Sequence, residues 1–253
     1  MEVHTKCTLS AGEVSYLCHM ERRMLQLVGE PDTLSRWMEG LFPPAQVGFT
    51  RAQYGVGALP DGRTVFPYTD RAGRVIDGKV MAYGPDGHRV KIEDSRLKIE
   101  DSSIINCQLS IINSRTPPVS WLHALDRLER PLALPLFGED LLGTLPFAPI
   151  CLVESEKTAL IAKLWRPDCT WLATGGKSTF TADRCRVLAG RTVLVWPDAD
   201  AIGEWMETAA TLGARLGIDF RFPAAYLIRI REGPPKGDLA DLIVAARAHT
   251  NEP

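Results

Sequence analysis

The sequence predicts an α/β protein, with a central parallel sheet flanked by helices in the C-terminal half and a small α+β subdomain ahead of it. Three observations lead to this prediction. From residue 148 onward, short apolar runs alternate with stretches of helical length and spacing. Between residues 51 and 91, turns rich in Gly and Asp separate strand-like runs. Residues 1 to about 40 mix apolar and charged side chains at helical spacing. Strands that alternate with helices favour a parallel sheet covered on both faces.

The composition is that of an ordinary globular protein. The chain has 253 residues, 45% hydrophobic and 24% charged, which is enough for two modest domains. It has no apolar run long enough to span a membrane and no secretory signal, so we expect a cytoplasmic protein without a membrane partner. With a net charge of −2, nucleic-acid binding would need a local basic patch. The six cysteines form no C-x-x-C pair, which predicts buried free thiols rather than a zinc site.

The N-terminal part is predicted to contain two helices followed by an antiparallel meander. The helices are expected over Glu13–Val28 and Asp32–Leu41, with Asp32 or Thr33 as the cap of the second and Phe42-Pro43-Pro44 as its end. The strand-like runs of the meander are Thr64–Tyr68, Arg74–Ile76 and Lys79–Tyr83.

A seven-residue repeat follows the meander, since K-I-E-D-S-R-L is followed directly by K-I-E-D-S-S-I. Its Ser, Asn and β-branched residues are poor helix formers, so we interpret residues 91–115 as an insertion in a surface loop. A short helix over Trp121–Leu128 and an apolar linker over 131–149 are expected next.

Four strands and four helices are predicted for the C-terminal part. The strands are expected over Pro149–Val153, Thr170–Ala173, Arg191–Trp196 and Tyr226–Ile230, and the helices over Ser155–Trp165, Thr181–Leu188, Ile202–Leu216 and Leu239–His249. The chain is therefore divided into an N-terminal helical segment (1–45), a small α+β subdomain with the repeat insertion (46–147) and an α/β domain (148–253).

Acidic residues follow two of the predicted strands directly. Glu154 comes after the first strand, and Asp198 and Asp200 come after the third. Ligands of open parallel sheets gather at the carboxyl ends of the strands, so these carboxylates would converge if the two strands are neighbours. Clustered oxygen ligands select a hard cation, Mg²⁺ or Mn²⁺. The alternative is that the same residues only cap helices.

The segments that carry these acids resemble the motifs of the Toprim family. Cys151–Leu160, C-L-V-E-S-E-K-T-A-L, resembles the first motif, an apolar strand that ends in a glutamate. Val195–Asp200, V-W-P-D-A-D, resembles the second, a strand that ends in D-x-D. Thr174–Lys177 stands at the position of the glycine turn, and Lys236–Leu242 is similar to the lysine-and-aspartate segment that closes primase Toprim domains. The order and spacing of the motifs carry the resemblance, which covers about residues 148–245.

A second segment resembles the part of bacterial DNA primases that precedes Toprim. Gly62–Ile76 reads G-R-T-V-F-P-Y-T-D-R-A-G-R-V-I, similar to a G-R-x-x-F-P strand followed by a D-x-x-G-R-V-I hairpin. The whole chain also resembles Toprim proteins of Bacteroidetes that are associated with mobile elements. It departs from the primases in three ways. Ser155 replaces a glycine, no Cys/His set for a zinc-binding domain is readable, and we expect no helicase-binding domain after the Toprim segment.

The resemblance implies roles for several residues. Asp198 and Asp200 would hold the divalent ion, and Glu154 would join them or act as a general acid/base. The candidate nucleotide- or phosphate-binding residues are Lys157, Gly175, Gly176, Lys177, Lys236 and Asp238. The candidate nucleic-acid-binding residues are Arg63, Arg74 and Lys79. The alternatives are solvated surface lysines, glycines that only end a strand, a solvated hairpin face, and an N-cap at Asp238. The tryptophans are expected in the core, with Trp205 as the exception.

Three functions remain open on the sequence alone. The first is a primase-like nucleotidyltransferase that uses nucleotides, single-stranded DNA or another nucleic acid, and a helicase or other replication partner. The second is a metal-dependent nuclease or nickase, since Toprim domains also occur in topoisomerases and in overcoming-lysogenization-defect-type nucleases. The third is a non-catalytic module that binds nucleic acid or a replication partner.

Overall fold

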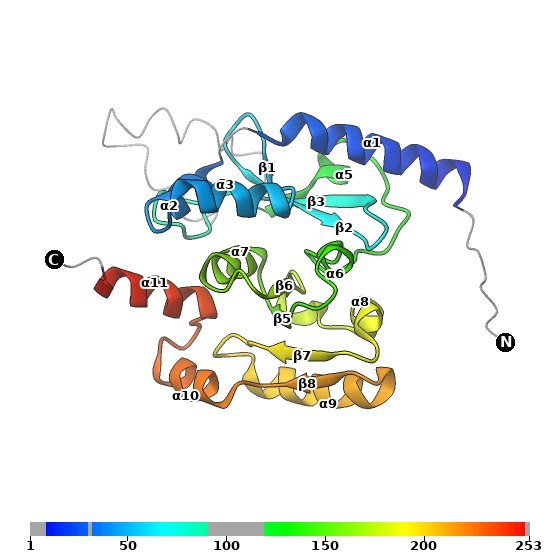
Figure 1. Ribbon diagram of the computed structural model, residues 1–253. Coiled ribbons are helices and arrows are strands. Elements are labelled where there is room, and N and C mark those ends of the chain that lie inside the picture. Colours follow the sequence, from blue (N-terminus) through cyan, green and yellow to red (C-terminus); the bar gives the residue numbers. More distant parts are fainter. Residues whose placement is uncertain (1–8, 30–31, 91–118, 251–253) are drawn as a thin grey trace, which may run out of the picture.

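The chain folds around two four-stranded sheets, which lie one above the other in Figure 1. The computed structural model describes residues 9–29, 32–90 and 119–250, so the predicted repeat insertion lies outside the described residues. The first sheet is antiparallel, in the order β1-β2-β3-β4. The second is parallel, in the order β6-β5-β7-β8, as the alternation of strands and helices predicts.

Three N-terminal helices cover the first sheet in Figure 1: α1 (Ala11–Leu27), α2 (Thr33–Glu39) and α3 (Pro44–Gln53). Asp32 caps α2, because its carboxylate accepts the backbone N–H of Ser35. The third helix was not predicted from the sequence. Pro44 begins it, since proline fits the first helical position, where the missing N–H has no intrahelical partner.

The first sheet contains β1 (Gly57–Ala58), β2 (Thr64–Thr69), β3 (Val75–Met81) and β4 (Val119–Trp121). The runs predicted as separate strands at Arg74–Ile76 and Lys79–Tyr83 are one strand, because β3 passes straight through Asp77-Gly78. Gly78 marks a close approach rather than a turn. A Cβ at this position would lie 2.6 Å from Leu122 Cδ1 and 2.9 Å from Val65 Cγ1. The expected short helix after this sheet is α5 (Leu122–Leu125).

The second sheet contains β5 (Ile150–Val153), β6 (Thr170–Ala173), β7 (Thr192–Val195) and β8 (Asp219–Arg221). The helices of this half are α6 (Leu141–Thr144), α7 (Glu156–Trp165), α8 (Ala182–Cys185), α9 (Ile202–Leu216), α10 (Ala224–Glu232) and α11 (Leu239–Thr250), with 3₁₀ turns η1 (Lys177–Thr179) and η2 (Arg186–Leu188). No helix of the described chain is long and apolar enough to cross a membrane.

The strand predicted over Tyr226–Ile230 is wrong, because this segment lies within α10. Tyr226 and Ile230 are its buried residues, and their spacing of four places both on one face of a helix. Arg229 and Arg231 face solvent. The fourth strand is β8, which precedes this helix and pairs with β7.

Helices pack on both faces of the parallel sheet. Cys151 and Val153 belong to the apolar core that includes residues of α7 and α11, whereas Ile150 and Leu152 belong to the core with α8 and α9. Trp205 lies in the second core with 1% of its surface exposed, so the expectation that it faces solvent was wrong. Its ring lies 4.8 Å from that of Phe180. The free thiols of Cys151, Cys169 and Cys185 are buried as predicted, whereas Cys18 is exposed, so the prediction was wrong for this residue.

We predict that Gly78→Ala destabilises the protein by about 1–3 kcal/mol, because the added methyl group overpacks Leu122 and Val65. The free energy of unfolding in urea measures the effect. Gly48→Ala is the matched control, since Gly48 lies in α3 with nothing within 4 Å of an added Cβ, and it should be neutral or slightly stabilising. Equal stability of Gly78→Ala and the wild type would contradict the packing described for β3.

Candidate functional site

Four carboxyl groups gather at the carboxyl ends of β5 and β7, and we call Glu154, Asp198, Asp200 and Asp238 the acidic edge. Glu154 follows β5, and Asp198 and Asp200 follow β7. The two strands are hydrogen-bonded neighbours in parallel register, so their carboxyl ends meet at the same edge. Asp238 reaches this edge from the segment before α11, because Ala199 N–H donates to Gly237 O over 2.9 Å.

Burial and mutual repulsion shift the protonation of this cluster. Burial is the largest of the effects that raise the pKa of Asp198 to about 8, and the carboxyl groups of Glu154, Asp238 and Asp200 contribute the next part of this shift. The pKa of Glu154 is also raised, first by burial and then by Asp200, whereas the Lys177 ammonium opposes this shift. The acidic edge therefore carries a proton near neutral pH unless a cation takes its place.

The donor chemistry of the acidic edge fits a hard cation. Among the residues described, however, no group of three His, Cys, Asp or Glu side chains is arranged so that it could hold a metal ion by itself. Mg²⁺ does not need such a group, since it keeps several waters and is held by one or two carboxylates together with substrate phosphates.

The loop after β6 connects the acids of this edge. Gly175 N–H donates to Glu154 O over 2.8 Å, and Lys177 Nζ donates to Asp200 O over 2.9 Å. Lys177 also lies 3.3 Å from a carboxylate oxygen of Glu204. Gly176 O accepts the hydroxyl of Thr174 over 3.0 Å, which closes the turn. The two predicted phosphate-binding glycines thus shape the loop that holds Glu154 and Asp200.

Residue 175 must be a glycine, because Tyr68 of the first sheet lies too close to leave room for a side chain. Its φ is +84°, and a Cβ there would lie 2.1 Å from the Tyr68 hydroxyl oxygen. Tyr68 OH donates a hydrogen bond to Glu156, the second residue after Glu154. Lys79 Nζ lies 2.9 Å from Glu156 Oε1 and donates to Gly175 O over 2.8 Å. Lys79, a predicted nucleic-acid contact, thus links β3 of the first sheet to α7 and to the loop after β6.

The other predicted phosphate-binding residues lie at the start of two helices. Lys157 is in the first turn of α7, with its Nζ 5.9 Å from the centre of the Trp37 ring. Lys236 is exposed. Asp238 accepts the N–H of Asp241 over 2.9 Å and the hydroxyl of Thr158 over 2.8 Å. Asp238 therefore caps the start of α11 and links this helix to α7 through the hydroxyl of Thr158.

Arg63 and Arg74, the remaining predicted nucleic-acid contacts, form ion pairs within the first sheet and its turns. Arg63 Nε lies 2.8 Å from Asp61, and the Arg74 side chain lies 2.5 Å from Asp70. These pairs leave little free positive charge for a phosphate backbone.

Sequence reasoning missed Glu156 and Tyr68. Glu156 resembles any acidic residue in the first turn of a helix, and Tyr68 resembles any aromatic residue in a strand. Only the approach of the two sheets distinguishes them, and no local pattern encodes that approach.

The family model described as Domain of unknown function (DUF6371) matches residues 32–199, more than half of the chain. Among solved structures, the DnaG primase catalytic domain bound to ssDNA is 14% identical with a TM-score of 0.51, over 95% of this chain and 80% of that one. The DnaG catalytic core is 15% identical with a TM-score of 0.51, over 93% of this chain and 79% of that one.

The primase fragment of the bacteriophage T7 primase-helicase protein is 15% identical with a TM-score of 0.45; the match covers 79% of this chain but 66% of that one, just under two thirds. No curated protein sequence matches the chain. The mixed α/β fold with its four-stranded parallel sheet is similar to that of DNA primase catalytic domains.

Lys79→Met should destabilise the protein by about 3–5 kcal/mol, because it leaves the carboxylate of Glu156, 1% exposed, without its ammonium partner. Urea unfolding measures the loss, and Lys79→Met/Glu156→Gln should recover part of it. Arg74→Met is the control, because the Arg74 side chain is 44% exposed and should change stability by no more than about 1 kcal/mol. A loss no larger than that of the control would refute the role of this ion pair.

Stability should depend on pH through Asp198. Its folded pKa of about 8 lies above the ordinary value of 3.8, so the folded protein binds more protons than the unfolded chain between these values. In EDTA, the free energy of unfolding should therefore fall as the pH rises from about 4 to about 8. The fall should be smaller in Asp198→Asn, and Mg²⁺ should stabilise the wild type at pH 8 more than this variant. If the free energy of unfolding fell equally with pH in the wild type and in Asp198→Asn, the environment described for Asp198 would be contradicted.

Proposed function

The chain belongs to the family described as Domain of unknown function (DUF6371), and we propose that it is a primase-like enzyme that transfers nucleotidyl or phosphoryl groups on nucleic acid with a divalent metal. The observation that carries the proposal is the acidic edge, at which neighbouring parallel strands bring Glu154 and Asp198 together within a primase-like fold. One of the similar solved structures is bound to ssDNA, which supports nucleic acid as the substrate class.

Within this proposal, residues 148–253 form a Toprim domain, residues 46–147 a primase-like α+β subdomain, and residues 1–45 a helical segment ahead of it. The motifs at Cys151–Leu160 and Val195–Asp200 support the Toprim assignment, because they end the adjacent strands β5 and β7. A role in the replication of a mobile element, with a helicase or other replication partner, rests on the sequence resemblance alone.

Glu154, Asp198 and Asp200 would hold Mg²⁺ or Mn²⁺, which would neutralise phosphate charge and align the attacking hydroxyl. Burial and Asp200 raise the pKa of Glu154 above that of an ordinary glutamate, a shift in the direction that suits a general acid/base. Lys177 is held against Asp200 O and Glu204, so its ammonium is positioned beside the acids. Lys157 and Lys236 are the candidates for contacts with the phosphates of a bound nucleotide.

The test is primer synthesis on single-stranded DNA with Mg²⁺ or Mn²⁺ and labelled nucleotides. Asp198→Ala should lower the rate by at least about 100-fold, because the variant loses a ligand for the ion that stabilises the transition state. Asp219→Ala is the matched control, since Asp219 lies at the opposite, amino end of the sheet and pairs with Arg221. Its rate should equal that of the wild type.

Full activity of Asp198→Ala would show that the reaction uses another site. Nicking of plasmid DNA without added nucleotides, abolished by Asp198→Ala, would replace the synthetic activity with a nuclease at the same site. Nucleic-acid binding that is equal in Mg²⁺ and EDTA, without any product, would leave a binding module instead of an enzyme.

A further inference from the structure

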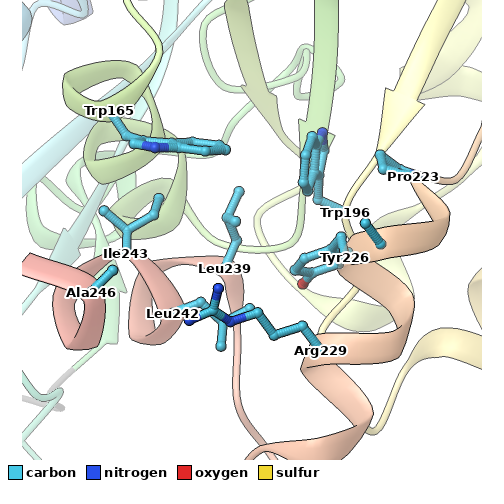
Figure 2. Close-up of a pocket in the computed structure, with 10 residues that line it drawn as sticks. Trp165, Trp196, Pro223, Tyr226, Arg229, Leu239, Leu242, Ile243 and Ala246 are labelled. Atoms are coloured by element: carbon cyan, nitrogen blue, oxygen red, sulfur yellow. The ribbon is translucent and has the colours of Figure 1, made fainter.

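A pocket of about 370 Å³ lies among α7, the end of β7, α10 and α11. Figure 2 shows aromatic and aliphatic side chains around it, and we call it the aromatic pocket. Its walls include Trp165, Trp196, Tyr226, Arg229, Leu242 and Ile243. Its volume falls within the range of about 300–1,000 Å³ that is usual for small-ligand sites.

Trp165 and Trp196 offer ring surface to a ligand, and the buried ring of Tyr226 packs against Trp196. The ring centres of Trp165 and Trp196 lie 6.2 Å apart, and those of Trp196 and Tyr226 lie 5.0 Å apart. Trp165 is 41% exposed although it is a large apolar side chain. A concave surface made of rings fits a flat, aromatic group that can stack on them.

Arg229 supplies one positive charge at this pocket. Its side chain is exposed and lies across the pocket from Trp165 in Figure 2. It forms no ion pair or hydrogen bond with any residue of the described chain, in contrast to Arg63, Arg74, Arg166 and Arg221, each of which has an acidic partner. The pocket therefore combines stacking surfaces with a cation that is free to meet an anionic group of the ligand.

Two residues that line the pocket are close in sequence to carboxylates of the acidic edge. Trp196 lies two residues before Asp198 in the sequence, and Tyr226 OH donates to Pro197 O over 2.7 Å. Leu239, another lining residue, directly follows Asp238. The pocket and the acidic edge are thus connected by the short segments Trp196-Pro197-Asp198 and Asp238-Leu239.

We propose that the aromatic pocket binds one base of a single-stranded nucleic acid, with Arg229 contacting a phosphate of that strand. This inference rests on the proposed function, because it takes the substrate of the acidic edge to be nucleic acid. A base must be unpaired to enter the pocket, since the bases of a duplex are stacked within the helix. The reacting phosphate belongs at the carboxylates, so the base in the pocket is that of a neighbouring, unreacted nucleotide of the bound strand.

The test measures the anisotropy of a labelled single-stranded oligonucleotide at fixed salt, in EDTA, so that neither metal nor catalysis is required. Arg229→Ala and Trp165→Leu should each weaken binding about tenfold. Arg231→Ala is the matched control, because Arg231 is also exposed on α10 but does not line the pocket. It should bind within about twofold of the wild type. Because Trp165 also contacts Trp171 and Trp196, the exposed Arg229 provides the variant that tests binding without disturbing packing.

Wild-type affinity of both pocket variants, or no binding of the strand by the wild-type protein, would overturn the proposal. So would variants that keep their affinity for the strand but lose affinity for a labelled nucleoside monophosphate, because the pocket would then belong to a free nucleotide. Failure of the proposed function is a separate result. It would be seen as absence of primer synthesis in a protein whose strand binding still depends on Arg229 and Trp165.

Discussion

The ion pair between Lys79 and Glu156 is the contact on which the geometry of the acidic edge depends. Glu156 is 1% exposed and begins α7, whereas Lys79 comes from β3 of the first sheet. A buried carboxylate is tolerated only when its charge is neutralised and its lone pairs accept hydrogen bonds. Lys79 and Tyr68 both donate hydrogen bonds to the carboxylate of Glu156. Lys79 also donates a hydrogen bond to Gly175 O, and Gly175 N–H donates one to Glu154 O. The antiparallel sheet therefore positions a residue of the acidic edge that belongs to the parallel sheet.

Apolar contacts between the sheets keep water away from this ion pair. Phe137 forms a β-bridge with Ala173 at the end of β6 and stacks on Tyr54 with ring centres 5.2 Å apart. Its ring also lies 6.0 Å from that of Tyr68. Tyr54 OH donates to Trp171 O over 2.8 Å, so the buried aromatic residues are anchored by polar groups as well. Separation of the sheets would expose these rings and the charge of Glu156 together, which makes the two halves one cooperative unit.

Local rules predicted much of this architecture, and long-range contacts decided the rest. The cap at Asp32, the parallel order of the second half and the meeting of Glu154 with Asp198 follow from residue spacing and strand connection rules. The helix over Tyr226–Ile230 could not be distinguished from a strand, because a run of five largely apolar residues fits the side-chain period of a helix and that of a strand equally well. The partner of Lys79 is 77 residues away, so nothing near Lys79 in the sequence indicates that it is partly buried in an ion pair.

The distribution of charge limits how such a protein could hold a nucleic-acid strand. Its net charge is −2, and Arg63, Arg74 and Lys79 are already paired with acidic side chains. Release of counterions by many free cations, which dominates the affinity of basic nucleic-acid-binding proteins, is therefore a small contribution here. Stacking of bases on aromatic rings needs no net charge and tolerates any sequence. The aromatic pocket offers such rings together with Arg229, which has no acidic partner among the described residues, and the acidic edge would attract phosphate only through a bound cation. Under the proposed function, attachment of the strand and the chemistry thus depend on different physical interactions.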